Sequence, residues 1–183
     1  MNRIPILTRE EAPSSIANLY DGVKRKLGVV PNMVQALGNS AAGLQSYLAL
    51  SGAVSEGTLD TRLREKIALR VAELNDCEYC LSAHTAIGGL LKVPAAELEA
   101  AQAGVSTDRR EQAVLDLVEA IVEARGKVSN ASLEAARSAG VDDGQITEIV
   151  ANIALSVFTN YFNRLAQTEI DFPRVHSLQL AAI

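Results

Sequence analysis

The stretch that decides the fold is REKIALRVAELNDCEYCLSAHTAIG, residues 64–88, in which two helical patterns meet across a short turn. Its second half holds both cysteines of the chain and one of its two histidines within eight positions. We predict one helix up to Leu74. Asn75 with Glu78 has the pattern of a capping box that opens the next helix, over about residues 76–91. The short connection favours two antiparallel neighbours.

The rest of the chain also reads as helical, because cap and stop residues divide it into segments of helical length. Ser40 and Asp108 suit helix N-caps, Pro94 suits a first helical position, and Gly126 and Gly140 suit helix ends. No sustained period-2 alternation is present, so the sequence predicts an all-α fold, and no linker divides residues 1–183, so we expect one domain. The expected helices cover residues 14–27, a short segment from 31, and 41–54, 61–74, 76–91, 94–103, 112–124, 130–139 and 142–170.

A weak internal similarity aligns EKIALRVAELNDCEYC from Glu65 with EIVANIALSVFTNYFN from Glu148. Asn160 and Asn163 then stand where the first segment has Cys77 and Cys80. Two interpretations stay open. The segments are either amphipathic helices with similar periodicity, or copies of one duplicated helical unit whose second copy has lost the thiols.

Composition excludes several classes of function. The 183 residues are 48% hydrophobic and carry a net charge of −5 without a basic cluster, so we expect no nucleic-acid partner. The longest apolar stretches are far shorter than the roughly 20 residues of a membrane span. The N-terminal residues lack the apolar run of a secretory signal. We therefore expect a cytoplasmic protein, where a neighbouring pair of cysteines is typically catalytic, redox-active or metal-binding.

The two cysteines and His84 share one face of the predicted helix over residues 76–91, because each residue of an α-helix is rotated by 100° about the helix axis from the one before. Cys77 and Cys80 lie in its first turns, where free N–H groups and the helix dipole stabilise a thiolate. His84 follows Cys80 by one turn, so their side chains can meet. Thiols at positions i and i+3 can close a small disulfide ring, as in dithiol oxidoreductases.

Glu65 is a candidate partner for His84. It lies outside the charged stripe of its helix, and it is almost as far from the turn as His84, so antiparallel helices bring the two level. A carboxylate beside an imidazole orients it and raises its basicity, and His84 could then take a proton from Cys80 directly or through a water. The charged stripe consists of Arg62, Lys66, Arg70 and Glu73.

Each of these residues also has a structural interpretation. A cysteine or histidine on an apolar face is often a packing residue, and Glu65 could pair with a neighbouring cation. A c-type haem needs the histidine directly after the second cysteine. A structural zinc site needs four ligands, and only His176 could add a fourth. A thioredoxin-like site needs a strand before the helix. We therefore expect no metal and no cofactor.

Residues 64–88 resemble the core motif of the alkyl hydroperoxidase D branch of the carboxymuconolactone decarboxylase superfamily. The matching elements are Glu65, the Cys77-x-x-Cys80 pair and His84. The flanks over residues 27–54 and 160–173 are similar to the longer, peroxidase-related members. The decarboxylase branch lacks the cysteine pair, so lactone decarboxylation is not implied. The resemblance implies an all-helical bundle that assembles as trimers or hexamers.

The resemblance also implies thiol-dependent peroxidase activity. Cys80 would attack the hydroperoxide substrate, Cys77 would resolve it and exchange with an external dithiol reductant, and His84 with Glu65 would relay protons. Two alternatives stay open: a dithiol–disulfide oxidoreductase, and a non-enzymatic redox-sensing scaffold. Tyr79 points to another face, as a packing residue does. Three residues of the last helix could line the site or serve only as packing contacts: Asn160, Asn163 and Arg164.

Overall fold

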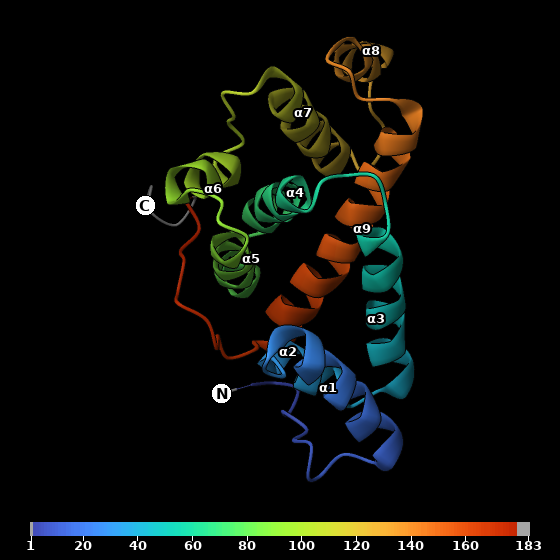
Figure 1. Ribbon diagram of the computed structural model, residues 1–183, viewed down its shortest axis with the longest axis vertical. Coiled ribbons are helices and arrows are strands. Elements are labelled where there is room, and N and C mark those ends of the chain that lie inside the picture. Colours follow the sequence, from blue (N-terminus) through green and yellow to red (C-terminus); the bar gives the residue numbers. More distant parts are fainter. Residues whose placement is uncertain (1, 179–183) are drawn as a thin grey trace.

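The computed structural model describes residues 2–178, and over that range the chain forms nine α-helices and no β-strand (Figure 1). The prediction of an all-α fold is confirmed. The helices are α1 (Ser14–Leu27), α2 (Asn32–Leu37), α3 (Ala41–Ser55), α4 (Thr61–Leu74), α5 (Glu78–Leu90), α6 (Ala95–Gln102), α7 (Arg109–Glu123), α8 (Asn130–Ser138) and α9 (Asp143–Ala166).

Two helix starts, after Ser40 and after Asp108, have the caps that the sequence indicated, and a third has a cap that it did not. The Ser40 hydroxyl accepts a hydrogen bond from the Gly43 backbone N–H at the start of α3. The Asp108 carboxylate accepts two backbone N–H groups at the start of α7. At α9, Asp142 and Gln145 form a reciprocal capping box. These local bonds satisfy N–H groups that a helix start leaves unpaired.

Three predicted boundaries are wrong. Helix α7 begins at Arg109, directly after its cap Asp108 and three residues before the predicted start at 112. Helix α5 begins at Glu78 with Cys77 as its N-cap, while Asn75 ends α4, because Asp76 adopts a left-handed conformation with φ 52° and separates the helices. Helix α9 ends at Ala166, four residues before the predicted end at Ile170, because Gln167 is also left-handed with φ 49°.

The internal similarity is not a structural repeat. Residues 65–80 run from α4 through the turn into α5, whereas residues 148–163 lie wholly inside α9. Of the two interpretations left open, the structure therefore favours shared helical periodicity over a duplicated unit.

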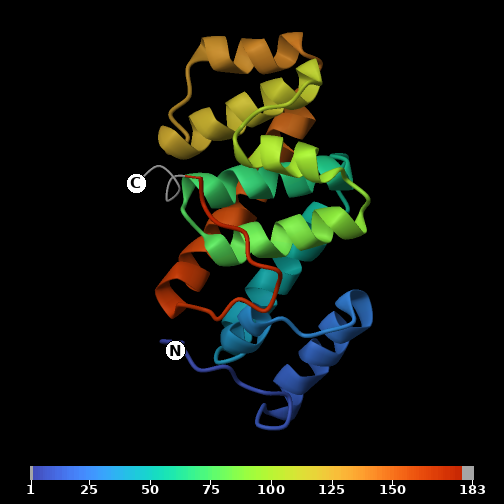
Figure 2. The ribbon, with the colours of Figure 1, turned by 90° about the vertical axis from the view of Figure 1, so that its left-hand side faces the viewer.

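Helix α4 is the centre of the fold, and α5, α6, α7 and α9 pack around it (Figures 1 and 2). Ile67, Leu69 and Val71 on α4 are fully buried. One apolar cluster joins α4 to α1, α2 and α5 and includes both cysteines; a second joins α4 to α7, α8 and α9. Neither α9, the longest helix, nor any other helix within residues 2–178 could cross a membrane, because none is both long and apolar enough.

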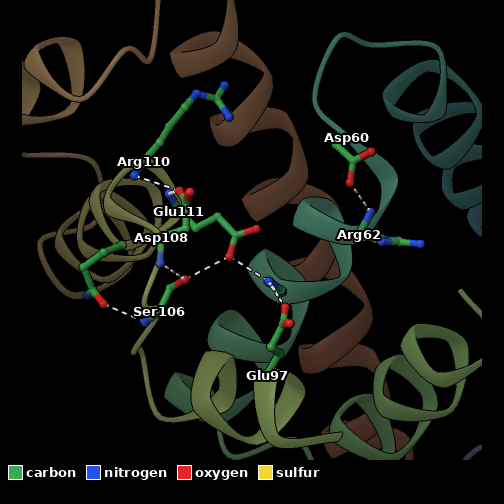
Figure 3. A network of polar contacts seen from close by, with 9 residues as sticks. Asp60, Arg62, Glu97, Ser106, Asp108, Arg110 and Glu111 are labelled. Carbon is green, nitrogen blue, oxygen red and sulfur yellow. Dashed lines mark hydrogen bonds and ion pairs between the residues drawn. The ribbon is translucent and has the colours of Figure 1, made fainter. Parts of the chain in front are cut away.

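Two of the four residues in the predicted charged stripe of α4 are buried, while Arg62 is exposed. Lys66 is 4% exposed and Glu73 is 2% exposed. The Lys66 ammonium lies 2.8 Å from a Glu97 oxygen and 2.6 Å from a Glu111 oxygen. Figure 3 shows these two carboxylates converging from α6 and α7. Lys66 therefore joins α4 to α6 and α7 instead of facing water, as a buried charge requires close partners.

The segment after α9 folds back across α5 (Figure 1). The Val175 backbone N–H donates to the Ser82 hydroxyl, and the Ser177 hydroxyl donates to Glu73. The first residues are tied to the end of α9 through the Arg3 N–H and the Ala166 carbonyl. The single domain expected over residues 1–183 includes Met1 and residues 179–183, which lie outside the described residues, and it stays a prediction.

Candidate active site

Both cysteines lie at the start of α5, and their sulfurs are joined as a disulfide with a Cα–Cα distance of 5.3 Å. Cys77 is the N-cap itself, and its sulfur accepts the Cys80 backbone N–H at 3.3 Å. A sulfur thus takes the place that a Ser, Asp or Asn oxygen usually holds at a helix start. The first turn can stabilise negative charge on a thiolate once the pair is reduced.

Glu65 and His84 meet as predicted. Glu65 Oε2 lies 2.7 Å from His84 Nδ1, and the two side chains are 15% and 25% exposed. Because α4 and α5 are antiparallel across a three-residue turn, residues at similar distances from it come level. A carboxylate on Nδ1 holds the imidazole proton there and leaves Nε2 to exchange a proton with another group.

Tyr47 on α3 is a nearby residue that the sequence did not single out. Burial is the main cause that raises the pKa of the Tyr47 phenol, and the negative charge of Glu65 raises this pKa further. Helix α3 therefore brings a neutral phenol close to the carboxylate of the Glu65–His84 pair. No motif pointed to this residue, because its position depends on how α3 packs.

Asn163 on α9 contacts the thiol pair. Its Nδ2 donates to Cys80 Sγ at 3.4 Å, within a buried environment. Its Oδ1 is buried without a hydrogen-bond partner among the described residues. Such a donor stabilises a thiolate more than a neutral thiol, because hydrogen bonds to charged acceptors are stronger.

Asn160 and Arg164 hold the turn between α4 and α5. The Asn75 amide donates to Asn160 Oδ1 at 3.0 Å, and Arg164 lies 3.3 Å from an Asp76 oxygen. Of the three candidates on the last helix, only Asn163 touches a sulfur among the described contacts, and the other two position the start of α5.

Access to the sulfurs differs although both cysteines are only 2% exposed. A pocket of about 870 Å³ lies between the start of α5, the end of α9 and the following segment. Cys77 lines it, whereas Cys80 and His84 are not among its lining residues. This pocket offers a route to the disulfide from the side of Cys77.

Tyr79 serves as a packing residue, as its face predicted. Its hydroxyl donates to Asp171 at 2.8 Å and accepts the Met33 backbone N–H, and its ring meets Phe172 edge-on. Burial raises the pKa of Tyr79. The phenol therefore stays neutral and joins α2, α5 and the C-terminal segment.

His176, the remaining candidate for a zinc ligand, contacts Glu78 at 2.7 Å on the outer side of α5. Residues 2–178 contain no group of three His, Cys, Asp or Glu side chains arranged to hold a metal ion.

Sequence comparison matches residues 42–120, from α3 to α7, to the Carboxymuconolactone decarboxylase family. This range contains Glu65, both cysteines and His84. An uncharacterized protein of Haemophilus influenzae is 55% identical over 42 residues, which cover 22% of this chain and 37% of that protein. The chain thus spans well under half of that relative's length.

Solved structures share the fold over nearly the whole chain. An uncharacterized peroxidase-related protein of Ralstonia eutropha, described as an alkylhydroperoxidase AhpD core, is 24% identical with a TM-score of 0.84, covering 93% of this chain and 92% of that one. A peroxidase-related protein of Silicibacter is 26% identical with a TM-score of 0.76, covering 94% and 90%. The debrominase Bmp8, in complex with 2,3,4-tribromopyrrole, is 21% identical with a TM-score of 0.78, covering 92% and 91%.

Proposed function

We propose that this chain belongs to the carboxymuconolactone decarboxylase superfamily, in its alkyl hydroperoxidase D-like part, and that it is a thiol-dependent peroxidase. Its substrate is a hydroperoxide, and the Cys77–Cys80 pair cycles between dithiol and disulfide. Peroxidase-related proteins share its fold, which supports a redox role. The proposed location is the cytoplasm, where thiols are kept reduced.

The observation that carries the proposal is the combination of the cysteine pair with the Glu65–His84 contact of 2.7 Å. Packing alone does not require a carboxylate–imidazole pair on the face that also carries two thiols. Asn163 adds a donor at the sulfur of Cys80. Helix α5 carries a nucleophile and a base on adjacent turns, and α4 adds the orienting carboxylate. These are the parts that nucleophilic catalysis needs.

In the first step, the Cys80 thiolate attacks the distal oxygen of the hydroperoxide. A sulfur–oxygen bond forms, the oxygen–oxygen bond breaks, and the alkoxide leaves and takes up a proton. The sulfur is oxidised by two electrons to a sulfenic acid, and the peroxide is reduced to an alcohol. His84, held by Glu65, takes the thiol proton and can return one to the leaving alkoxide.

In the second step, the Cys77 sulfur attacks the Cys80 sulfenic acid. A disulfide forms and the hydroxyl leaves as water. An external thiol then reduces the disulfide by exchange, and the resemblance to the family implies a dithiol for this step. Cys77 receives the attack, since it is the cysteine that lines the pocket.

The test is peroxide consumption by the purified protein with a panel of reductants, including a lipoamide-type dithiol and a thioredoxin-type protein. We expect turnover with at least one reductant, and none for Cys80→Ser. Thiol exchange without peroxide consumption would favour the dithiol–disulfide oxidoreductase. A change in assembly on oxidation without turnover would favour the redox-sensing scaffold.

A second substrate class belongs in the same assay because of the fold shared with a debrominase. A thiolate can also attack a bromine of a halogenated pyrrole: a sulfur–bromine bond forms, the carbon–bromine bond breaks, and the ring carbon takes up a proton. The second thiol then attacks that sulfur, the disulfide forms, and bromide and the thiol proton leave. Turnover of 2,3,4-tribromopyrrole without turnover of hydroperoxides would show that the substrate is a halogenated pyrrole. The proposed roles of the two cysteines would then be unchanged.

A further inference from the structure

The pocket beside Cys77 has a polar wall with unused hydrogen-bonding capacity. Asn163 and Thr168 are 3% and 8% exposed, and both line it. Asn163 Oδ1, Thr168 Oγ1 and one oxygen of Asp76 are buried without a hydrogen-bond partner among the described residues. Buried polar groups are nearly always paired, so three unpaired atoms at one pocket indicate a polar occupant.

Two of these atoms define what the occupant offers near the sulfur. Asn163 Oδ1 and the Asp76 oxygen are acceptors only, so they fit N–H groups of a ligand. Asn163 reaches Cys80 with its other amide atom, which places the free acceptor within one side chain of the disulfide. An amide or ammonium close to a ligand's own sulfur would meet this requirement.

The rim of the pocket carries charges of both signs. Arg164 and Arg174 line it, with side chains 51% and 56% exposed, and so do Glu78 and Glu169. Arg164 contacts Asp76 at 3.3 Å and donates to the Asn75 carbonyl, and Arg174 contacts Glu78 at 2.8 Å. Both arginines are more than half exposed, so a ligand carboxylate can compete for them. The pocket therefore combines acceptors near the sulfur with guanidinium and carboxylate groups at the mouth.

We propose that this pocket binds the reductant, and that the reductant is a small cysteinyl thiol with carboxylates, of the glutathione type. The inference rests on the proposed function in taking the Cys77–Cys80 disulfide as the form to be reduced. It replaces the dithiol expected from the family resemblance. A cysteinyl thiol carries an amide next to its sulfur and carboxylates at its ends, and it is small enough to reach a sulfur that is 2% exposed.

The exchange consumes two such thiols. The first thiolate attacks Cys77 Sγ, the Cys77–Cys80 bond breaks, and Cys80 leaves as a thiolate next to the Asn163 amide. A second thiolate attacks the small-thiol sulfur of the mixed disulfide, and Cys77 leaves. The products are a small disulfide and the reduced pair, which takes up the two protons that the thiols released.

The experiment follows reduction of the oxidised protein without peroxide, by acid quench, alkylation and intact mass. The probes are glutathione and its diethyl ester, which lacks the carboxylates. Arg164→Gln should slow reduction by glutathione about two- to fivefold, the range of an exposed ion pair, and leave the ester unaffected. Arg137→Gln is the matched control, because that exposed arginine also forms ion pairs, with Glu134 and Asp143.

For each probe, the reduction rate of a variant is divided by the rate of the native protein with the same probe. The different acidities of glutathione and its diethyl ester therefore do not affect the comparison. Peptide mapping of quenched samples should place the mixed disulfide on Cys77. An equal effect of Arg164→Gln on both thiols, or a mixed disulfide on Cys80, would overturn the proposal. So would a native disulfide that a thioredoxin-type protein reduces and glutathione does not. A protein that is reduced by glutathione yet consumes no peroxide would instead refute the proposed function alone.

Discussion

Cys77 and Cys80 are equally buried but have different neighbours. Cys80 receives the Asn163 amide and lies one turn before His84, whereas Cys77 caps α5 and lines the pocket. A donor and a base favour the thiolate on Cys80, and the pocket favours exchange at Cys77. The two sulfurs therefore suit different steps of one cycle.

Single-cysteine variants separate these roles. Cys77→Ser should form a sulfenic acid on Cys80 after one equivalent of peroxide and then stop, because no second thiol resolves it. Cys80→Ser should form little sulfenic acid. A sulfenic-acid probe read by mass spectrometry measures both variants. Equal labelling of the two would contradict the assignment of Cys80 as the attacking cysteine.

His84 is expected to act as a base on Cys80. His84→Ala should slow sulfenic-acid formation in single-turnover measurements at neutral pH. The defect should shrink as the pH rises past about 8.5, the ordinary pKa of a thiol, because solvent then deprotonates Cys80 without help. Glu65→Gln should show a smaller defect with the same pH trend. A defect that is constant with pH would mean that His84 only positions the site.

Asn163 is expected to stabilise the Cys80 thiolate. Asn163→Leu keeps the approximate size and removes the donor, so sulfenic-acid formation at pH 7 should fall about tenfold, as for loss of a hydrogen bond to a charged group. Asn160→Leu is the comparison on the same helix, since Asn160 contacts Asn75 and no sulfur among the described contacts. Equal rate losses in the two variants would point to disturbed packing as the cause.

The Glu65–His84 contact could be predicted from sequence because it depends only on distance from one turn. The contact of Asn163 with Cys80 could not, since it joins residues 83 positions apart and rests on the packing of α9 against α5. Burial of Lys66 was missed for the same reason, because its carboxylates come from α6 and α7.

Among the helices, local signals predicted most starts but failed where the backbone turns left-handed. Ser40, Asp108 and Asp142 cap helices through bonds to residues two or three positions on. Asp76 and Gln167 have positive φ, which short-range patterns do not reveal in residues other than glycine. Both lie beside the candidate site, so the least predictable backbone shapes the pocket.

Glu148 on α9 anchors the loop that leads into α4. Its carboxylate accepts the Thr58 and Leu59 backbone N–H groups, and these bonds lower the pKa of Glu148. A lowered pKa in the folded state means that the stabilisation is present above the unfolded value of about 4.3 and is lost as the pH falls through the folded value.

Glu148→Gln should therefore destabilise the protein at pH 7, by about 1 kcal/mol for a partly exposed group. The difference from the native protein should shrink as the pH falls below the unfolded value of about 4.3, and it should approach zero once the pH is below the lowered pKa of Glu148 in the folded protein. Urea unfolding at several pH values measures it. Glu134→Gln on α8 serves as a control for the loss of one negative charge. If the stability difference between the native protein and Glu148→Gln stayed constant into acid, it would not come from the charge of Glu148.

The molecule as a whole leaves one side of α9 uncovered. Tyr161 and Leu165 are 61% and 62% exposed, and Val150 is also exposed. The apolar residues recur at spacings of three and four, which gives a single stripe along the helix. Helix α3, which packs on α9, exposes several alanines of its own. The stripe consists of Val150, Ala154, Phe158, Tyr161 and Leu165.

A stripe of this kind is expected to meet a second copy of the chain, as the predicted homo-oligomer requires. Light scattering coupled to size exclusion should give the mass of a trimer or hexamer at micromolar concentration. Tyr161→Glu with Leu165→Glu should shift the mass toward the monomer, because each carboxylate would be buried without a partner. Leu90→Glu is the control, since Leu90 is exposed at the end of α5, outside the stripe. A native monomer would contradict the assembly, and an intact oligomer in the double variant would place the contact on another surface.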